Sequence, residues 1–506
     1  MQQRDPLDLP EIRALLGPFL TLDSLYSCVL VNWEWHDTFT PFLWTTFYFG
    51  RETHNTTLQP PSEASIQQYA HFIQRMVVRS LSPTFQLDMF KDTPLTQLKE
   101  LRLCEAIGRS KSNGSLAWIF QQNPGLRVVD YDGGYSSTSS DSSCTDFEVL
   151  LNSPALTDLT TQYVNYQQKH LEPFRQLCAT RLKRASFYMD TFSMEAQWLE
   201  IPMPHLQELC IRNIGPMSGL QTILQCPNLR TLRWVASNTQ SASSFQQIME
   251  VCPRLKAIDL QSMALTDESI ARVLDGLRES ATEVIIPGRK DPFGRSGAMG
   301  FGFKTKAFAA LSRRHFGTLV VLDMGPNSLE VTSAMILQVL TSCPNLREIT
   351  ACQLYAKGIR DGPGVWACRK LEVFKVMIRG FRDPLIDQIR IAVFRRFATL
   401  PRLRVLHMGG QDPSEEGVAL RLECGLAQLA GLAQLESVSV YPGPQKMRRE
   451  DVEWIRAHWK GLRVLNGCLH SVQAVTDVIR EVLTSRGKAT DEGFERLAFH
   501  TANHRY

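Results

Sequence analysis

The glycines of this 506-residue chain are the first residues whose spacing could support chemistry, because glycine-rich loops bind phosphates. Gly294, Gly297, Gly300 and Gly302 are closely spaced, but no Gly-Lys-Ser/Thr ending and no clear preceding strand accompany them. Residues 487–490 read Gly-Lys-Ala-Thr and lack the upstream glycine of a nucleotide-binding loop. Neither segment therefore predicts a phosphate site.

Histidine, cysteine and serine likewise form no catalytic or metal-binding pattern. The only His-x-x-x-His pair is His500 with His504, which has no evident third ligand. None of the twelve cysteines has a partner at C-x-x-C spacing, and there is no Gly-x-Ser-x-Gly elbow. We expect a non-catalytic protein that holds no metal and no cofactor.

Composition narrows the class of protein further. Hydrophobic residues make up 43% and charged residues 21%, which is typical of a folded protein, and the formal net charge is only +4. So small a net charge argues against a chain-long nucleic-acid surface. No run of about 20 apolar residues and no signal peptide is present. We expect neither nucleic acid nor membrane as a partner, and a cytoplasmic or nuclear location.

The elements that would position functional residues begin with a small helical segment. Apolar residues recur at helical spacing over residues 9–19, 22–29 and 31–39, and Pro10 suits the first turn of a helix. Three short helices in about 40 residues form only a marginal core. Apolar faces left over in such a unit are expected to dock on another protein.

The ordered apolar residues of this segment resemble an F-box. They are Leu9-Pro10-Glu11-Ile12, Leu16, Phe19-Leu20, Leu25, Leu30-Val31, Trp35 and Leu43-Trp44. Two departures from the family pattern leave this apolar frame intact: Glu11 follows Pro10 directly, and Asp23 stands one residue further from its leucine.

The resemblance implies docking on a Skp-type adaptor, which links an F-box protein to a cullin-based ubiquitin ligase. The residues it assigns to adaptor binding are Leu9, Pro10, Ile12, Leu16, Leu30, Val31 and Trp35. For Trp35 and Trp44, packing within the small core is the favoured interpretation, with adaptor contact as a secondary role.

One phrase then recurs along the chain: an apolar residue, two variable residues, an apolar residue, one variable residue and an apolar residue. Clear copies start at Leu98, Leu206, Leu229, Leu255, Leu319, Leu346, Leu371, Leu403, Leu435 and Leu462. Weaker copies start at Leu126, Leu156 and Leu182, and a doubtful one lies near Val284. The copies resemble the leucine-rich repeats of F-box proteins, with a strand in each phrase.

Between phrases the apolar spacing becomes helical, as at Phe245, Ile248 and Met249. Strand and helix in alternation predict an α/β solenoid with parallel strands on the concave side and helices on the convex side. Five cysteines stand just before a phrase and are expected to pack as small apolar residues: Cys178, Cys226, Cys252, Cys343 and Cys368.

The concave surface is the expected place for a client protein, because the residues between the buried positions of each strand face outward there. Their charges are mixed, which suits a protein partner. As client-binding candidates we take Arg233, Asp259, Asp323, Lys375 and His407, although solvated surface is the alternative for each.

The expected domains are an F-box at 1–50, a linker and connecting helix at 51–90, a repeat array at 91–470 and a helical cap at 471–506. The helix is expected from Ile66 to Leu81, and a Gly/Ser-rich loop from Tyr131 to Asp146.

The predicted function is substrate recognition in an SCF-type ubiquitin ligase, in which the repeats hold a client for ubiquitination and proteasomal degradation. The alternative is a repeat scaffold that acts outside ubiquitin transfer.

Overall fold

In the computed structural model the chain forms two compact units, residues 1–228 and residues 229–506. The structure describes residues 6–49, 62–78, 90–93, 95–103, 116–132, 141–162, 168–188, 200–212, 216–235, 242–260, 265–278, 280–286, 302–325, 330–362, 365–381, 386–409, 418–440 and 447–466.

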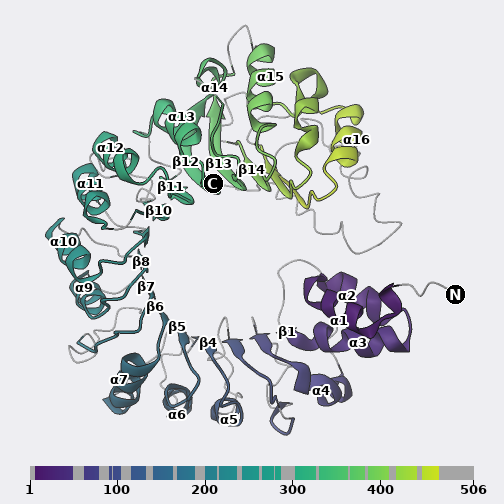
Figure 1. The fold of residues 1–506 in the computed structure, drawn as a ribbon, viewed down its shortest axis with the longest axis vertical. Coiled ribbons are helices and arrows are strands. Elements are labelled where there is room, and N and C mark those ends of the chain that lie inside the picture. The colour runs from purple at the N-terminus through teal and green to yellow at the C-terminus, as the bar shows by residue number, and fades with distance from the viewer. Residues whose placement is uncertain are drawn as a thin grey trace. The chain divides into compact units, whose positions relative to one another are not determined.

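The first unit begins with the three predicted helices and continues as strands that alternate with helices (Figure 1). Its described helices are α1 (Pro10–Leu16), α2 (Leu22–Val29), α3 (Trp33–Thr45), α4 (Glu63–Tyr69), α5 (Ala117–Gln122), α6 (Asp141–Leu151), α7 (Leu171–Thr180) and α9 (Pro216–Leu224). Its strands pair in parallel and in chain order: β1 (Thr46–Phe49), β2 (Arg75–Val78), β3 (Glu100–Leu103), β4 (Val128–Asp132), β5 (Asp158–Gln162), β6 (Arg184–Tyr188) and β7 (Glu208–Arg212).

The second unit repeats the same alternation. Its strands are β8 (Thr231–Val235), β9 (Ala257–Asp259), β10 (Glu283–Ile285), β11 (Val321–Asp323), β12 (Glu348–Tyr355), β13 (Val373–Arg379), β14 (Val405–His407), β15 (Ser437–Ser439) and β16 (Val464–Asn466), each parallel to the next. Its described α-helices are α10 (Ala242–Val251), α11 (Asp267–Gly276), α12 (Thr305–Arg314), α13 (Ser333–Ser342), α14 (Ala356–Asp361), α15 (Ile386–Phe397) and α16 (Arg449–His458). Two short 3₁₀ segments, η7 (Leu422–Cys424) and η8 (Leu426–Gly431), stand between β14 and β15.

Each unit is a solenoid of the leucine-rich-repeat type, because every repeat buries the same positions of its phrase. The leucines that open the phrases are at most 5% exposed, from Leu98 to Leu462. Full burial of one such side chain stabilises the fold by about 2 kcal/mol. Even the weak copies at Leu126, Leu156 and Leu182 form strands, and the doubtful copy near Val284 is β10. In each unit the strands lie along one side and the helices along the other (Figure 1).

The predicted packing role of the pre-phrase cysteines is confirmed. Cys178, Cys226, Cys252, Cys343 and Cys368 are all at most 1% exposed. Burial raises the pKa of the Cys252, Cys343 and Cys368 thiols to about 12, so these thiols stay protonated at neutral pH.

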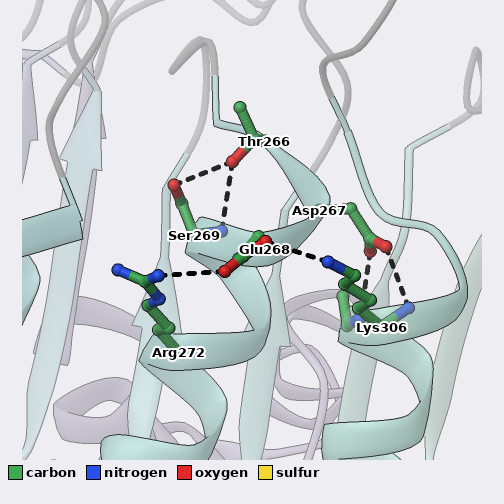
Figure 2. A network of polar contacts seen from close by, with 7 residues as sticks. Thr266, Asp267, Glu268, Ser269, Arg272 and Lys306 are labelled. Atoms are coloured by element: carbon green, nitrogen blue, oxygen red, sulfur yellow. Dashed lines mark hydrogen bonds and ion pairs between the residues drawn. The ribbon is translucent and has the colours of Figure 1, made fainter.

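Carboxylates join neighbouring repeats at their helix ends. Asp267, at the start of α11, accepts hydrogen bonds from the backbone N–H groups of Lys304 (2.9 Å), Lys306 (2.8 Å) and Ala307 (2.9 Å). Figure 2 shows this carboxylate reaching the first turn of α12. Those N–H groups have no partner within the helix, so one side chain satisfies the start of the next repeat's helix.

The predicted helix from Ile66 to Leu81 is wrong in its second half. Helix α4 ends at Tyr69, and Met76 and Val77 belong to strand β2, which pairs with β1 and β3. The array of strands therefore starts at Thr46 and not after residue 90. Strand pairing on both sides outweighs the helical spacing of the apolar residues, because β-branched residues such as Val77 and Val78 fit a buried strand.

The expected loop from Tyr131 to Asp146 is also corrected at both ends. Tyr131 is part of β4, and Asp141 already begins α6. Of the linker predicted at 51–64, residues 51–61 lie outside the described residues, and the last two residues belong to α4. Residues 287–301 of the Gly-containing insertion predicted at 287–304, and the C-terminal cap, also lie outside the described residues. Within the described part of the chain, no helix combines the length and apolar character that a membrane span requires.

Candidate functional site: two interaction surfaces

The first candidate surface is formed by helices α1 to α3, and side-chain caps fix the starts of α2 and α3. Thr21 accepts a hydrogen bond from the Ser24 N–H (3.2 Å) at the start of α2, and Asn32 accepts one from the Trp35 N–H (2.9 Å) at the start of α3. Such caps satisfy backbone donors that have no partner inside the helix. The short segments therefore form helices although few of their residues are buried.

A small core holds the three helices together. Leu25 is 6% exposed and Phe39 is 1% exposed, with the Phe39 ring 5.5 Å from that of Trp35. Arg13 is buried and its guanidinium pairs with the Glu34 carboxylate at 3.3 Å. Phe42 covers Gly17, where an added Cβ would lie 2.4 Å from the ring.

Trp44 connects this core to the start of the solenoid. Its ring lies 6.2 Å from Phe47 of β1 and 5.2 Å from Tyr69 of α4. These contacts favour the core interpretation of Trp44, and the contact with Phe39 favours it for Trp35, although both tryptophans are only partly buried.

Most of the apolar side chains on these helices remain exposed to solvent. The exposed fraction is 42% for Leu9, 39% for Leu16, 70% for Leu30 and 57% for Val31. Pro10 is also exposed, and Ile12 and Trp35 are partly buried. The seven residues expected to bind an adaptor thus keep accessible surface.

The apolar surface is larger than the sequence pattern indicated. Trp33 is 80% exposed and Phe19 is 84% exposed, and the others above 50% are Leu15, Leu22 and Tyr26. The spacing of Leu22, Leu25 and Tyr26 predicts one packed helix face, yet only Leu25 is buried. Three short helices contain more large apolar residues than so small a core can enclose, which predicts left-over apolar faces but does not identify these residues.

The second candidate surface is the outward row of residues on the strands of the second unit. In the parallel register these residues stand beside one another on neighbouring strands: Arg233 is opposite Asp259, and Lys375 is opposite His407. The complete row is Arg233, Asp259, Ile285, Asp323, Thr350, Lys375, His407, Ser439 and Asn466. All five client-binding candidates therefore lie in one row.

Their accessibility differs, which corrects part of the prediction. Arg233 is exposed, and Asp323, Lys375 and His407 are partly buried. Asp259 is only 7% exposed and offers little surface to a client.

Burial also changes the electrostatics of the row. Burial raises the pKa of the Asp323 carboxyl, although the Gly325 N–H donates to it at 2.8 Å and opposes the shift. Burial and the nearby Lys375 ammonium lower the pKa of His407. Lys375 itself pairs with Glu348 at 3.2 Å. The central part of the row thus combines a carboxylate, a neutral imidazole and a paired cation, a mixed polarity that fits a protein partner.

Strands β12 and β13 extend the second surface beyond the row. A register shift between Ala351 and Gln353 accompanies this extension, which adds Tyr355 and Met377 to the same face. Tyr355 is 48% exposed. The alternation of β13 over seven residues, Val373–Arg379, was the available sequence signal for the longer strand.

The described residues contain no group of three or more His, Cys, Asp or Glu arranged to hold a metal ion. On the second surface, His407 Nε2 lies 3.4 Å from the Ser437 hydroxyl, a longer separation than the about 2.6–3.2 Å of a nucleophile hydrogen-bonded to its base. What the two surfaces offer chemically is binding: one apolar and helical, the other polar and strand-based.

Comparisons with known proteins give structural similarities but no sequence relatives. No family model matches the sequence, and no curated protein matches it. A chain of the yeast Rad7–Elc1 complex is similar in structure, with a TM-score of 0.38, 14% identity and coverage of 70% of this chain and 94% of that chain. An internalin (inlF) from Listeria monocytogenes str. 4b F2365 has a TM-score of 0.26, 13% identity and coverage of 80% of this chain and 83% of its own. The assignment of the fold rests on the repeated strand–helix units described above.

Proposed function

We propose that this protein is the substrate-recognition subunit of an SCF-type ubiquitin ligase. Helices α1 to α3 bind a Skp-type adaptor, and through it a cullin, while the strand face of the repeats binds a client protein. The observation that carries the proposal is the exposed apolar surface of α1 to α3, in the order of residues that resembles an F-box. The proposed location is the cytoplasm or the nucleus.

The physical reason is the imbalance between exposed and buried apolar side chains. Leu30, Val31 and Trp33 stand together at the turn between α2 and α3, and each is more than half exposed. A contiguous exposed apolar patch of this kind marks an interaction site in a soluble protein. Leu9 and Leu16 add exposed leucines at the two ends of α1, so an adaptor has anchors on α1 and at the turn between α2 and α3.

In this scheme the chain contributes no catalytic group. Holding the client near the charged ubiquitin raises the effective concentration of the client's lysines, which is sufficient to accelerate transfer by partner enzymes. No cofactor is required on this chain. The row with Arg233, Asp323, Lys375 and His407 supplies the polar contacts to the client, and Tyr355 supplies an aromatic one.

The test is binding of the full-length protein to a purified Skp-type adaptor. The variant Leu16→Asp/Leu30→Asp places two charges on exposed positions that contribute little to the core. We expect affinity to fall at least about 100-fold, because each lost apolar anchor costs about 2 kcal/mol.

The matched control is Val365→Asp, at a position in the second unit that is 62% exposed. This control is expected to bind as the wild type does, and both variants are expected to keep the wild-type melting temperature. If the folded wild-type protein does not bind the adaptor, the chain is a repeat scaffold that acts outside ubiquitin transfer.

A further inference from the structure

Basic residues gather at the edge of the second unit where strands β12 to β16 begin. This entry edge consists of residues 345–347, 369–372, 401–404, 433–436 and 460–463, which flank the opening leucines of the phrases. It contains seven Lys or Arg residues and two Glu residues, a formal charge of +5, whereas the whole 506-residue chain carries only +4. The formal charge of this one edge, +5, is thus larger than the net charge of the whole chain.

A backbone ladder aligns the entry edge. The N–H of Glu372 donates to the carbonyl of Arg347, that of Arg404 to Glu372, that of Glu436 to Arg404 and that of Arg463 to Glu436, each at 2.8 Å. The side chains of these residues follow one another at the strand spacing. Four intervals of about 4.8 Å give about 19 Å, the length of roughly six residues of extended chain.

The two carboxylates of the entry edge are already occupied by arginines. Arg347 pairs with Glu372 at 3.6 Å, and Arg404 pairs with Glu436 through two bonds of 3.1 and 2.9 Å. Lys370 donates to the Asn345 amide oxygen at 2.8 Å, and Arg369 donates to the Thr399 carbonyl. Among the described residues, no carboxylate pairs with the cations that remain: Arg369, Lys370, Arg402, Lys460 and Arg463.

A hollow of about 420 Å³ opens in this edge between β14 and β16. Its charged and polar lining is Arg404, Gln434, Glu436, Lys460 and Arg463. Gly461 contributes no side chain to the lining, and the nearest atom to an added Cβ would be the Leu435 carbonyl oxygen at 3.6 Å. Arg404 and Glu436 are paired with each other there, which leaves Lys460 and Arg463 to hold a further carboxylate, and a guanidinium binds a carboxylate through two parallel bonds.

We propose that the entry edge binds an extended acidic segment of a partner protein, with an Asp or Glu side chain seated in the hollow. The surface lies where the strands of the second unit begin, next to the outward row, whereas helices α1 to α3 belong to the first unit, so the proposal does not rest on adaptor binding. Charge complementarity identifies the partner: five cations without a carboxylate partner attract anionic groups and steer their approach.

An acidic peptide fits better than a nucleic acid because Glu372 and Glu436 interrupt the basic residues. A peptide can place neutral residues opposite these carboxylates. A nucleic acid carries a negative phosphate at every nucleotide, and the carboxylates of Glu372 and Glu436 would repel these phosphates.

The experiment measures binding of fluorescein-labelled probes to the full-length protein by anisotropy at 0.05 M salt. The probes are a twelve-residue peptide of alternating Glu and Ser, the same peptide with Lys in place of Glu, and a twelve-nucleotide oligo-dT. We expect saturable binding of the Glu peptide alone. Lys460→Glu/Arg463→Glu is expected to weaken this binding at least about tenfold and to reduce its salt dependence.

The matched control is Lys357→Glu/Arg395→Glu, which changes the total charge equally at exposed positions on α14 and α15. The control is expected to stay within twofold of wild type. Lys460→Gln/Arg463→Gln repeats the test with a milder change should the charge reversal disturb folding. The proposal is overturned if the Glu peptide does not bind, if the control weakens binding as much as the edge variant, or if oligo-dT binds more tightly than the peptide.

Discussion

His315 is buried between two repeats of the second unit, and both of its ring nitrogens are engaged. Its Nδ1 accepts the Ala281 N–H at 3.0 Å, and its Nε2 lies 3.0 Å from the Leu274 carbonyl, to which it donates. This arrangement requires the neutral ring. Burial lowers the pKa of His315 below its usual value of 6.5, because a charged imidazolium is costly in an apolar setting.

Since the pKa of His315 is lower in the folded than in the unfolded chain, the stabilising contribution of the neutral ring is complete above pH 6.5 and is lost as the pH falls below it. We predict that the melting temperature drops on acidification from pH 7 to pH 5. A His315→Gln variant, which can still accept and donate, should be less stable at pH 7 but show a shallower drop.

The control for this prediction is His458→Gln, at an exposed position on α16. It should retain the wild-type pH dependence, as thermal melts at a series of pH values would show. Equal pH dependence in wild type and His315→Gln would mean that His315 does not carry the effect.

At the scale of one element, the start of α12 depends on a carboxylate from the neighbouring repeat. Asp267 accepts three backbone N–H groups there, while the adjacent Glu268 makes surface pairs with Arg272 and Lys306, both at 2.9 Å (Figure 2). The two acidic residues thus provide a matched comparison between a helix cap and a surface ion pair.

We predict that Asp267→Ala destabilises the protein by about 1–3 kcal/mol, because three N–H groups lose a charged acceptor. Glu268→Ala should have a much smaller effect, since exposed pairs are screened by solvent. Chemical denaturation of both variants measures the difference. Similar losses of stability in Asp267→Ala and Glu268→Ala would show that the Asp267 cap does not stabilise α12.

At the scale of the whole molecule, each repeat contacts mainly its neighbours, so a local change should have local consequences. Phe39 is 1% exposed within the core of α1 to α3. We predict that Phe39→Ala, which removes about 3–5 kcal/mol of packing, accelerates amide hydrogen exchange in α1 to α3 and leaves β12 to β14 unchanged. Exchange that rises equally in both regions would indicate a single cooperative structure.

The repeats are the part of this protein that the sequence predicts best. The phrase Leu-x-x-Leu-x-Leu fixes which residues are buried in each strand, and parallel pairing then brings equivalent positions together. This is why Arg233, Asp323, Lys375 and His407, chosen by spacing alone, lie in one row. The same logic predicted burial of Cys226 and Cys343.

Strands β1 and β2 could not be predicted in this way. Their sequences, Thr46–Phe49 and Arg75–Val78, lack the phrase, and the apolar spacing around β2 also fits a helix. Only the neighbouring strand, distant in sequence, decides between the two conformations, because an apolar run satisfies either.

The sequence by itself determined the alternation of strand and helix, the positions of the buried leucines and the apolar frame of the first three helices, since each depends on local periodicity. The tertiary structure decided which apolar side chains stay exposed, such as Trp33 and Leu30, and which outward residue is buried, as for Asp259. It also aligned cations from four separate repeats, including Arg402 and Arg463, into one edge. Exposure and charge density depend on neighbours from distant parts of the chain, which no local pattern records.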